Sequence, residues 1–256
     1  MKRRVILYLF ILPLLQAAAQ QPEAAVIMNT SRELTLTGSL SATLTLTITE
    51  KNGSARVRKI SMLSKSFPDG TEKRTIKFLE PADVRGTAML IYDNKNSADE
   101  MWIYLPALKK TRRIVSSEKG KSFMSSEFSN ADMSSPAQSD FTNRHMENSG
   151  NDNQWIIESK PVNEEKADEY GYSRKISYLT ADKTEIRKME FYNFDDKLFK
   201  VIEIKAIQPG SNGKYIIKDM VARNLLNGRG SEIKFENILM NAAIDDNIFT
   251  LENIER

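Results

Sequence analysis

Apolar and polar residues alternate along most of this chain, a pattern typical of strands with one buried face. It is clearest in residues 40–49, where Leu40, Leu44 and Ile48 stand among serines and threonines. Similar short runs recur as far as the C-terminus. We therefore predict about 11–12 strands, at residues 40–49, 55–66, 72–79, 87–92, 101–105, 111–116, 155–161, 172–179, 185–192, 198–207, 215–223 and 233–240.

Two neighbouring runs are apolar on both faces. Residues 87–92 and 101–105 flank a polar loop at residues 93–100; each is too short for an ordinary helix and rich in β-branched and aromatic residues. A strand without a polar face has to be covered on both sides. The core covers one side, and the sequence leaves open what covers the other.

The strand predicted at residues 55–66 contains an irregularity. Its apolar residues Val57 and Ile60 are out of phase, so we expect a β-bulge near Lys59 to bring both to one face. Turn signals such as Asn52 followed by Gly53 separate this strand from its neighbours.

Short strands joined mostly by turns favour a mainly β fold, an antiparallel barrel or a strongly curved sheet. We also expect a short helix at residues 22–29 and a closing helical turn at residues 245–249. The chain has no sequence repeat and no linker rich in proline or glycine. We therefore predict one domain, residues 20–256.

Residues 117–153 break the strand pattern. Ser, Asn, Asp, Met and Gly abound there, and the apolar residues follow mixed spacings of three, four and five. Long stretches without strand signals inside a β domain are usually functional or mobile. We interpret this segment as a lid or flap.

The N-terminus has the features of a cleaved secretory signal peptide. Lys2, Arg3 and Arg4 precede an apolar run that is too short to span a bilayer, and three alanines follow, with cleavage expected after Ala19. The chain has no cysteine, so a lipid-modified N-terminus and disulfides are both excluded. An exported protein without disulfides suits the periplasm, and we expect a soluble protein there.

Removing the signal peptide changes the charge of the chain. The full chain has 37 basic and 34 acidic residues, and three of the basic ones lie in residues 1–19. The mature chain is therefore close to neutral. Nucleic-acid binding requires a strongly basic face, so we do not expect nucleic acid as a partner.

The residue inventory argues against catalysis. The single histidine, His145, lies inside the predicted lid, no cysteine is present, and no serine lies in a nucleophile-elbow pattern. Metal sites lack both cysteine and a second histidine. We expect no enzyme activity, no metal and no cofactor.

Two groups of residues are candidates for binding. The basic cluster is either a solvated edge that deters strand pairing or a docking patch for an acidic partner or anionic headgroups. The apolar group is either ordinary core or the lining of a ligand cavity. The basic cluster is Lys109, Lys110, Arg112 and Arg113; the apolar group is Phe78, Met89, Tyr92, Trp102, Tyr104, Phe123, Met124, Phe128 and Met133.

Three motifs resemble the LolA-like outer-membrane lipoprotein-sorting proteins, in particular their longer branch. The motifs are FLEPADVRGTAML from Phe78, WIYLPALKKTRRI from Trp102 and FMSSEFS from Phe123. The C-terminal residues 232–238 and 245–251 are similar too. This chain departs from the family pattern at Ser125, where the family usually has glycine, and at residues 130–131.

The resemblance implies an incomplete β-barrel with short helices and an apolar cavity that shelters acyl chains crossing the periplasm. It also implies an inner-membrane transporter, an outer-membrane acceptor or both as partners, with lipid or lipoprotein acyl chains as the load. A second possibility is a non-transporting periplasmic interaction module, either an envelope-stress sensor or an accessory subunit of a membrane exporter. Bound lipid favours the first, and a solid barrel in a stable membrane-protein complex favours the second.

Overall fold

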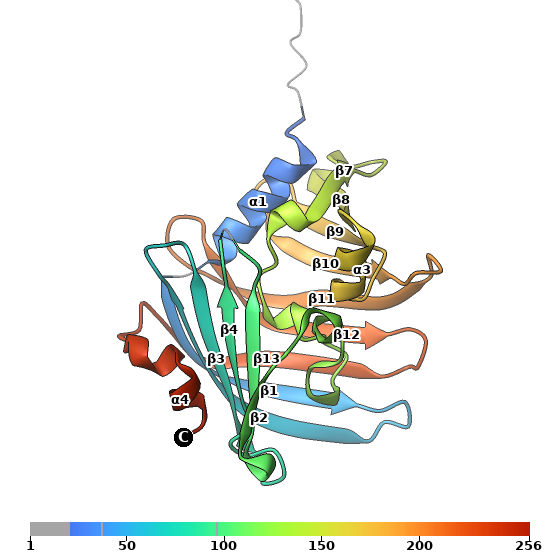
Figure 1. Ribbon diagram of the computed structural model, residues 1–256. Coiled ribbons are helices and arrows are strands. Elements are labelled where there is room, and N and C mark those ends of the chain that lie inside the picture. The colour runs from blue at the N-terminus through green and yellow to red at the C-terminus, as the bar shows by residue number, and fades with distance from the viewer. Residues whose placement is uncertain (1–20, 37, 96) are drawn as a thin grey trace, which may run out of the picture.

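One curved antiparallel sheet of thirteen strands forms the molecule in the computed structural model, which describes residues 21–36, 38–95 and 97–256. The strand order is β6-β5-β4-β3-β2-β1-β13-β12-β11-β10-β9-β8-β7, so β6 and β7 are the two edges and the sheet is not closed (Figure 1). This confirms the predicted incomplete antiparallel barrel.

The strands are β1 (Ser39–Thr49), β2 (Ala55–Ser66), β3 (Glu72–Glu80), β4 (Ala88–Asp93), β5 (Glu100–Leu105), β6 (Lys110–Arg113), β7 (Phe141–His145), β8 (Gln154–Pro161), β9 (Arg174–Thr180), β10 (Ile186–Tyr192), β11 (Leu198–Pro209), β12 (Tyr215–Asn224) and β13 (Gly230–Met240). Twelve of them lie where the alternation places them. The thirteenth, β7, lies inside the segment predicted as a lid. It is an edge strand with one apolar residue at its start, so it carries no alternation to detect.

In the described part of the chain, four α-helices accompany the sheet: α1 (Ala24–Thr35), α2 (Ser116–Lys119), α3 (Glu164–Tyr170) and α4 (Leu251–Ile254). Helix α1 is longer than the predicted helix at 22–29, and it packs Ala24, Ile27 and Met28 against Ile157 and Leu179 of the sheet. A 3-10 turn, η6 (Asp246–Phe249), leads into α4 and matches the predicted closing turn. No helix among the described residues is long and apolar enough to cross a membrane. The predicted signal peptide lies outside the described residues.

The prediction of a bulge in the strand 55–66 near Lys59 is wrong, because the irregularity at this point lies on the neighbouring strand. The register between β2 and β3 shifts between Lys59 and Ile60, and the extra residue is Leu79 on β3. Strand β2 therefore alternates without a break, so Val57 stays 50% exposed and Arg58 takes the buried position. A charged side chain is thereby turned to the inside of the sheet.

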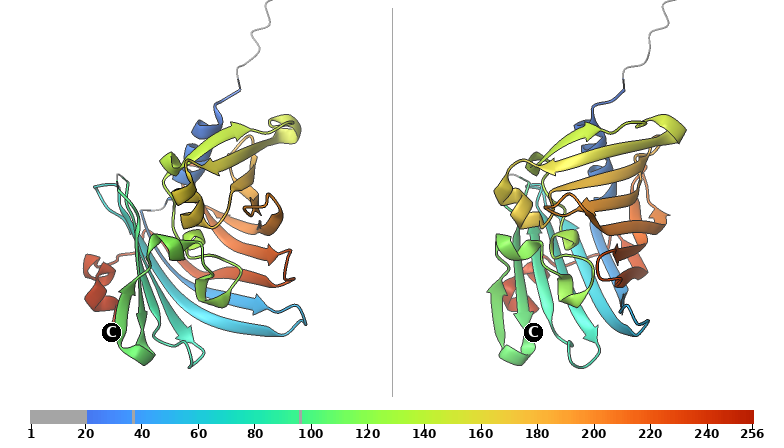
Figure 2. Two further views of the ribbon diagram at one scale, coloured as in Figure 1. Left: turned by 45° about the vertical axis from the view of Figure 1, so that its right-hand side comes forward. Right: turned by 90° about the vertical axis from the view of Figure 1, so that its right-hand side faces the viewer.

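The curvature of the sheet gives it a concave and a convex face. In both views of Figure 2 the segment after β6 lies within the curve. In the left view the C-terminal helix α4 lies on the outer side of β3, β4 and β5. The main hydrophobic core occupies the concave face, and a second cluster on the convex face joins β4 and β5 to η6 and α4. The C-terminal residues are therefore the second cover that the two-sided apolar strands require.

Candidate functional site

A cavity of about 320 Å³ lies on the concave face. Its volume falls within the range of about 300–1,000 Å³ that is usual for small-molecule sites. Its apolar floor comes from strands on both sides of β1; the residues are Leu40, Leu44, Ile60, Met62, Ile76, Met189, Phe191, Ile202, Ile216, Ile217, Met220, Ile233 and Phe235. The alternation of these strands places the side chains there, because each strand turns one face inward.

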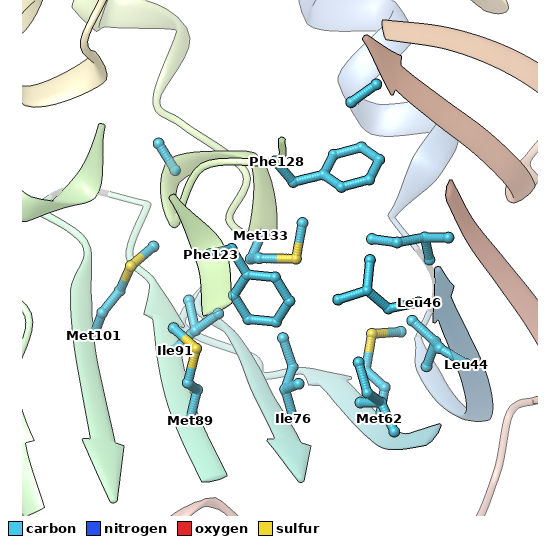
Figure 3. Packing of buried hydrophobic residues seen from close by; sticks show 14 of the residues in the cluster. Leu44, Leu46, Met62, Ile76, Met89, Ile91, Met101, Phe123, Phe128 and Met133 are labelled. Carbon is cyan, nitrogen blue, oxygen red and sulfur yellow. The ribbon is translucent and has the colours of Figure 1, made fainter. Parts of the chain in front are cut away.

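Residues 123–136, called the cover segment below, form the opposite wall of the cavity. Phe123, Phe128 and Met133 project from it and line the space. Figure 3 shows Phe123 projecting toward Ile76 on the floor. The ring of Phe123 also lies 5.8 Å from that of Phe78, centroid to centroid. The cover segment therefore seals part of the cavity with its own apolar side chains.

Two arginines on the inner face of the sheet, the buried Arg58 and the partly buried Arg74, hold the backbone of the cover segment. Arg58 on β2 donates a hydrogen bond to the carbonyl oxygen of Met124, and Arg74 on β3 donates one to the carbonyl oxygen of Met133. Burial lowers the pKa of Arg58, and the neighbouring Arg56 lowers it further. Arginine keeps its charge in proteins, so these charged donors remain available to the carbonyl oxygens.

A third arginine fastens the strained turn of the cover segment. Met124 and Ser125 have φ angles of 48° and 62°, in the left-handed region. Arg229 donates to the carbonyl oxygen of Ser125 at 2.8 Å and pairs with Glu127 at 2.9 Å. The other oxygen of Glu127 accepts a bond of 2.9 Å from Asn224. These bonds fix a turn that would otherwise be costly for non-glycine residues.

Further along, Asp132 of the cover segment pairs with Lys200 of β11 at 2.7 Å, and the same oxygen accepts from the backbone N–H of Ser129 at 2.7 Å. Ahead of the cover segment, a buried ion pair of 2.5 Å joins Lys119 of α2 to Glu169 of α3. Polar bonds, not apolar packing alone, therefore join the cover to the sheet.

An acidic group lies beside the cavity at the start of β3. Arg74 pairs with Glu72 at 2.8 Å and lies 3.8 Å from a carboxylate oxygen of Asp93. Burial raises the pKa of Asp93 to about 6, although Arg74 opposes the shift. Burial, and then the charge of Asp93, raises the pKa of Asp99 to about 7.

The nine apolar candidates from the sequence divide between the two faces. Phe123, Phe128 and Met133 line the cavity, Phe78 and Met89 belong to the concave core, and Met124 packs against that core. Tyr92, Trp102 and Tyr104 instead pack in the convex cluster, where the hydroxyl of Tyr92 donates to the carbonyl of Phe249 at 2.6 Å. The prediction that these three line the cavity is corrected by this placement. They alternate with Met89, Ile91, Met101 and Ile103, which face inward.

The basic cluster lies at the edge strand β6 and the turn before it. Arg112 pairs with Glu118 at 2.6 Å, and Arg113 pairs with Glu100 at 3.0 Å. Lys109 and Lys110 are exposed and have no ion pair among the described residues. Two of the four cations are therefore available to a partner.

His145 lies away from the cavity, on β7. Its Nε2 is 2.7 Å from the carbonyl oxygen of Pro22, and its Nδ1 is 2.9 Å from the hydroxyl of Ser149. The side chain thus ties the residues before α1 to the β7–β8 hairpin. Within the described part of the chain, no three His, Cys, Asp or Glu residues are grouped so as to hold a metal.

Sequence reasoning missed the charged residues that line the cavity or hold its cover. Glu72, Arg74, Asp132 and Lys175 line the cavity, and Arg58, Lys200 and Arg229 bond to the cover segment. One signal was available for Arg58, because it is in phase with Ile60 and Met62, which places it on the inner face. No comparable signal marks the others, because their partners are distant in sequence.

Comparisons with known proteins agree on the fold. A model of a family of uncharacterized proteins matches residues 70–256. No curated protein matches the chain. A DUF1329 family protein from Desulfovibrio piger is 25% identical, with 90% of this chain and 97% of that chain covered and a TM-score of 0.81.

Two further solved structures are similar. A candidate outer membrane lipoprotein-sorting protein domain from Vibrio parahaemolyticus is 24% identical, covering 91% of this chain and 98% of that one, with a TM-score of 0.82. A LolA superfamily protein from Nitrosomonas europaea is 16% identical, covering 91% and 99%, with a TM-score of 0.70. The fold is thus that of the LolA superfamily.

Proposed function

The chain belongs to this family of uncharacterized proteins, and we propose that it is a periplasmic carrier that binds lipoprotein acyl chains or other lipids and passes them between membrane partners. The observation that supports this most directly is the apolar cavity under the cover segment. The predicted signal peptide supports a periplasmic location. The likeness to a candidate lipoprotein-sorting domain supports lipoprotein acyl chains as the ligand. No step of this function requires catalysis.

The energetics of transfer favour such a cavity. Each buried methylene is worth about 0.8 kcal/mol, so a 16-carbon chain needs roughly 13 kcal/mol to enter water unprotected. A carrier has to match the membrane interior and then release the chain. A floor of Leu, Ile, Met and Phe side chains provides that environment without a specific shape.

Release requires an opening, and we propose that the cover segment is the part of the predicted lid that opens, since β7, in the later part of residues 117–153, is paired with β8 in the sheet. The hydrogen bonds to the carbonyls of Met124, Ser125 and Met133 can be exchanged for bonds to water. A protein hydrogen bond is worth only about 0.5–1.5 kcal/mol net, and up to about 3 kcal/mol when one group is charged. The larger cost of opening is the exposure of the buried side chains of Phe123 and Phe128, which an acyl chain or a membrane surface would cover during transfer.

Binding of a neutral apolar dye, N-phenyl-1-naphthylamine, tests the cavity. We expect the dye to fluoresce on binding wild-type protein, and Met220→Trp to weaken binding about tenfold or more, because Trp fills the space that Met220 lines. Val57→Trp, at an exposed site, is the matched control. Native mass spectrometry of protein from its own periplasm tests the load, and a lipid adduct is expected. Equal dye binding by Met220→Trp, with no lipid adduct, would end the carrier proposal.

The second candidate, a docking module, is favoured by a different observation. Leu108 is 63% exposed, and the unpaired Lys109 and Lys110 follow it directly. An apolar tip beside two cations suits an acidic membrane partner or anionic headgroups. Crosslinking from position 108 in intact cells would distinguish the two targets, and a stable complex with a membrane protein but no lipid would favour this second function.

A further inference from the structure

One cation in the cavity has no counter-ion of its own. Lys175 on β9 lines the cavity, yet its ammonium makes no hydrogen bond and no ion pair with any residue that the structure describes. Its Nζ lies 5.3 Å from the centroid of the Phe141 ring. A cation–π contact of this length is a weak substitute for an anion.

Two hydroxyls near Lys175 in the sequence are also unpartnered. Tyr172 is buried and lines the cavity, and within the described chain its hydroxyl makes no hydrogen bond. Ser177 follows Lys175 by two residues on the same strand, so the two share a face. It is fully buried, and its Oγ has no hydrogen-bond partner among the described atoms. Ser177 does not line the cavity, so the ammonium of Lys175 and the hydroxyl of Tyr172 are the two unpaired donors that a ligand there could bind. Buried polar groups are normally satisfied, so these two donors indicate an absent partner.

The nearest acid does not supply that partner. The negative charge of Asp132 raises the pKa of Lys175. The Oδ2 atom of Asp132, however, already lies 2.7 Å from Nζ of Lys200. Lys200, which also acts on Lys175, lowers the pKa. Asp132 is therefore paired with one of the two lysines, and the ammonium of Lys175 has no carboxylate of its own among the described residues.

We propose that Lys175, with the hydroxyl of Tyr172, binds the anionic head of a single-chain amphiphile whose hydrocarbon tail occupies the cavity. The inference rests on the proposed function, because the tail needs the apolar cavity, and it specifies the class of ligand. A carboxylate or a phosphate presents the acceptor oxygens that an ammonium and a phenol can bind. A neutral lipid would leave the ammonium unpaired in an apolar cavity, which is costly.

The pKa of Lys175 bears on whether its side chain is charged when an anion binds. Burial lowers its pKa to about 8. At neutral pH the ammonium is therefore still mostly charged, and a bound anion would raise its pKa and hold the proton. Binding of an anion should weaken as the pH rises above about 8, whereas binding of a neutral ligand should not.

Displacement of N-phenyl-1-naphthylamine by four ligands with the same 12-carbon tail tests the proposal. These are dodecanoate, dodecyl phosphate, dodecan-1-ol and dodecyltrimethylammonium, each below its aggregation concentration. We expect wild-type protein to prefer at least one anion to the alcohol by roughly tenfold or more, because charge-assisted hydrogen bonds are worth about 1.5–3 kcal/mol. The stronger of the two anions identifies the head group.

Lys175→Met should remove that preference while the alcohol still binds, and Tyr172→Phe should reduce the preference by less. Lys218→Met, at an exposed lysine on β12, is the matched control and should behave as wild type. If Lys175→Met does not fold, the pH series on wild type decides: an anion affinity that stays constant from pH 7 to 9.5 overturns the proposal. Binding of dye and alcohol without any anion preference also overturns it and leaves the carrier function standing. Failure of the dye and alcohol to bind would overturn both.

Discussion

Strands β4 and β5 are covered on both faces, and the two covers are held in different ways. On the convex face Phe249, Ile254 and their neighbours pack directly on Leu90 and Trp102. On the concave face the cover segment leaves a cavity and is joined to the floor by arginines and carboxylates. Apolar contacts that are broken by water gain nothing in return, whereas buried donors and acceptors can form new hydrogen bonds to water once it enters. The convex cover is therefore suited to remain in place, and the cover segment is suited to open and close.

The largest effect should come from breaking the packed cover. Phe249→Ala removes a fully buried ring that meets Phe67 edge to face at 6.0 Å between centroids. We expect a loss of about 3–5 kcal/mol in the free energy of unfolding, because a cavity replaces the ring. Urea denaturation measures it. The affinity for N-phenyl-1-naphthylamine should not change, because the convex cluster is separate from the cavity.

Phe194→Ala is the matched control for this change, since Phe194 is largely exposed and its removal should be nearly neutral. A weaker dye affinity in Phe249→Ala, measured on folded protein, would mean that the two faces are coupled. The convex cluster and the cavity would then not be independent of each other.

A smaller and more local effect should come from unfastening the cover segment. Arg58→Met removes the donor to the carbonyl of Met124 and the cation that lies 5.8 Å from the Phe78 ring centroid. We expect a loss of about 1–3 kcal/mol and faster amide hydrogen exchange in residues 117–136. Arg56→Met, on the same strand but exposed and paired with Glu50, should leave that exchange unchanged. Uniformly faster exchange over the whole sheet would show that Arg58 supports the core and does not fasten the cover.

The alternation of side chains could predict which residues share a face, but not which face is concave. The sequence analysis placed Tyr92, Trp102 and Tyr104 in one group with Met89, but the structure puts them on opposite faces, because the choice of the inner set depends on how the sheet curves. That curvature is a property of the whole thirteen-stranded sheet, which a local pattern does not contain. The fold was predictable because it follows from local patterns and a specific motif; the site was only partly so.

The charged contacts between the sheet and the cover segment were even harder to predict from the sequence. Arg58 reaches Met124, and Lys200 reaches Asp132, across 66 and 68 residues of sequence. A single sequence carries no local signal for such pairs. The sequence did single out Ser125 as a position where similar proteins usually have glycine, and the backbone there has a positive φ.

The two faces should also differ in their response to pH. Asp99 has a pKa raised from 3.8 to about 7 by burial and by Asp93, so its ionisation opposes folding. The folded state holds this proton more tightly than the unfolded state, and stability therefore falls as the pH rises from about 4 to about 7. Asp99→Asn should remove that loss, making the protein more stable at pH 8 than wild type by roughly 1–2 kcal/mol, after allowance for partial exposure.

Urea denaturation at pH 4 and pH 8 measures this difference, and Asp182→Asn, in an exposed turn, is the matched control. Phe249 packs on the convex face, away from Asp93 and Asp99, so Phe249→Ala should keep the pH dependence of wild type. An equal gain from Asp99→Asn at both pH values would place the effect on packing and remove ionisation as its cause.

The smallest effect concerns the turn that lets the cover segment bend over the cavity. At Ser125, φ is 62°, which costs an ordinary residue about 1–2 kcal/mol relative to glycine. Glycine is also more flexible in the unfolded chain, by about 0.5–1 kcal/mol. These terms oppose each other, so Ser125→Gly should change the free energy of unfolding by less than about 1 kcal/mol. Ser125→Val, with a branched Cβ, should cost more than Ser125→Ala. The melting temperatures of the three variants measure these differences. A higher melting temperature for Ser125→Val than for Ser125→Ala would mean that the left-handed turn does not form in solution. The cover would then depend on its arginines alone.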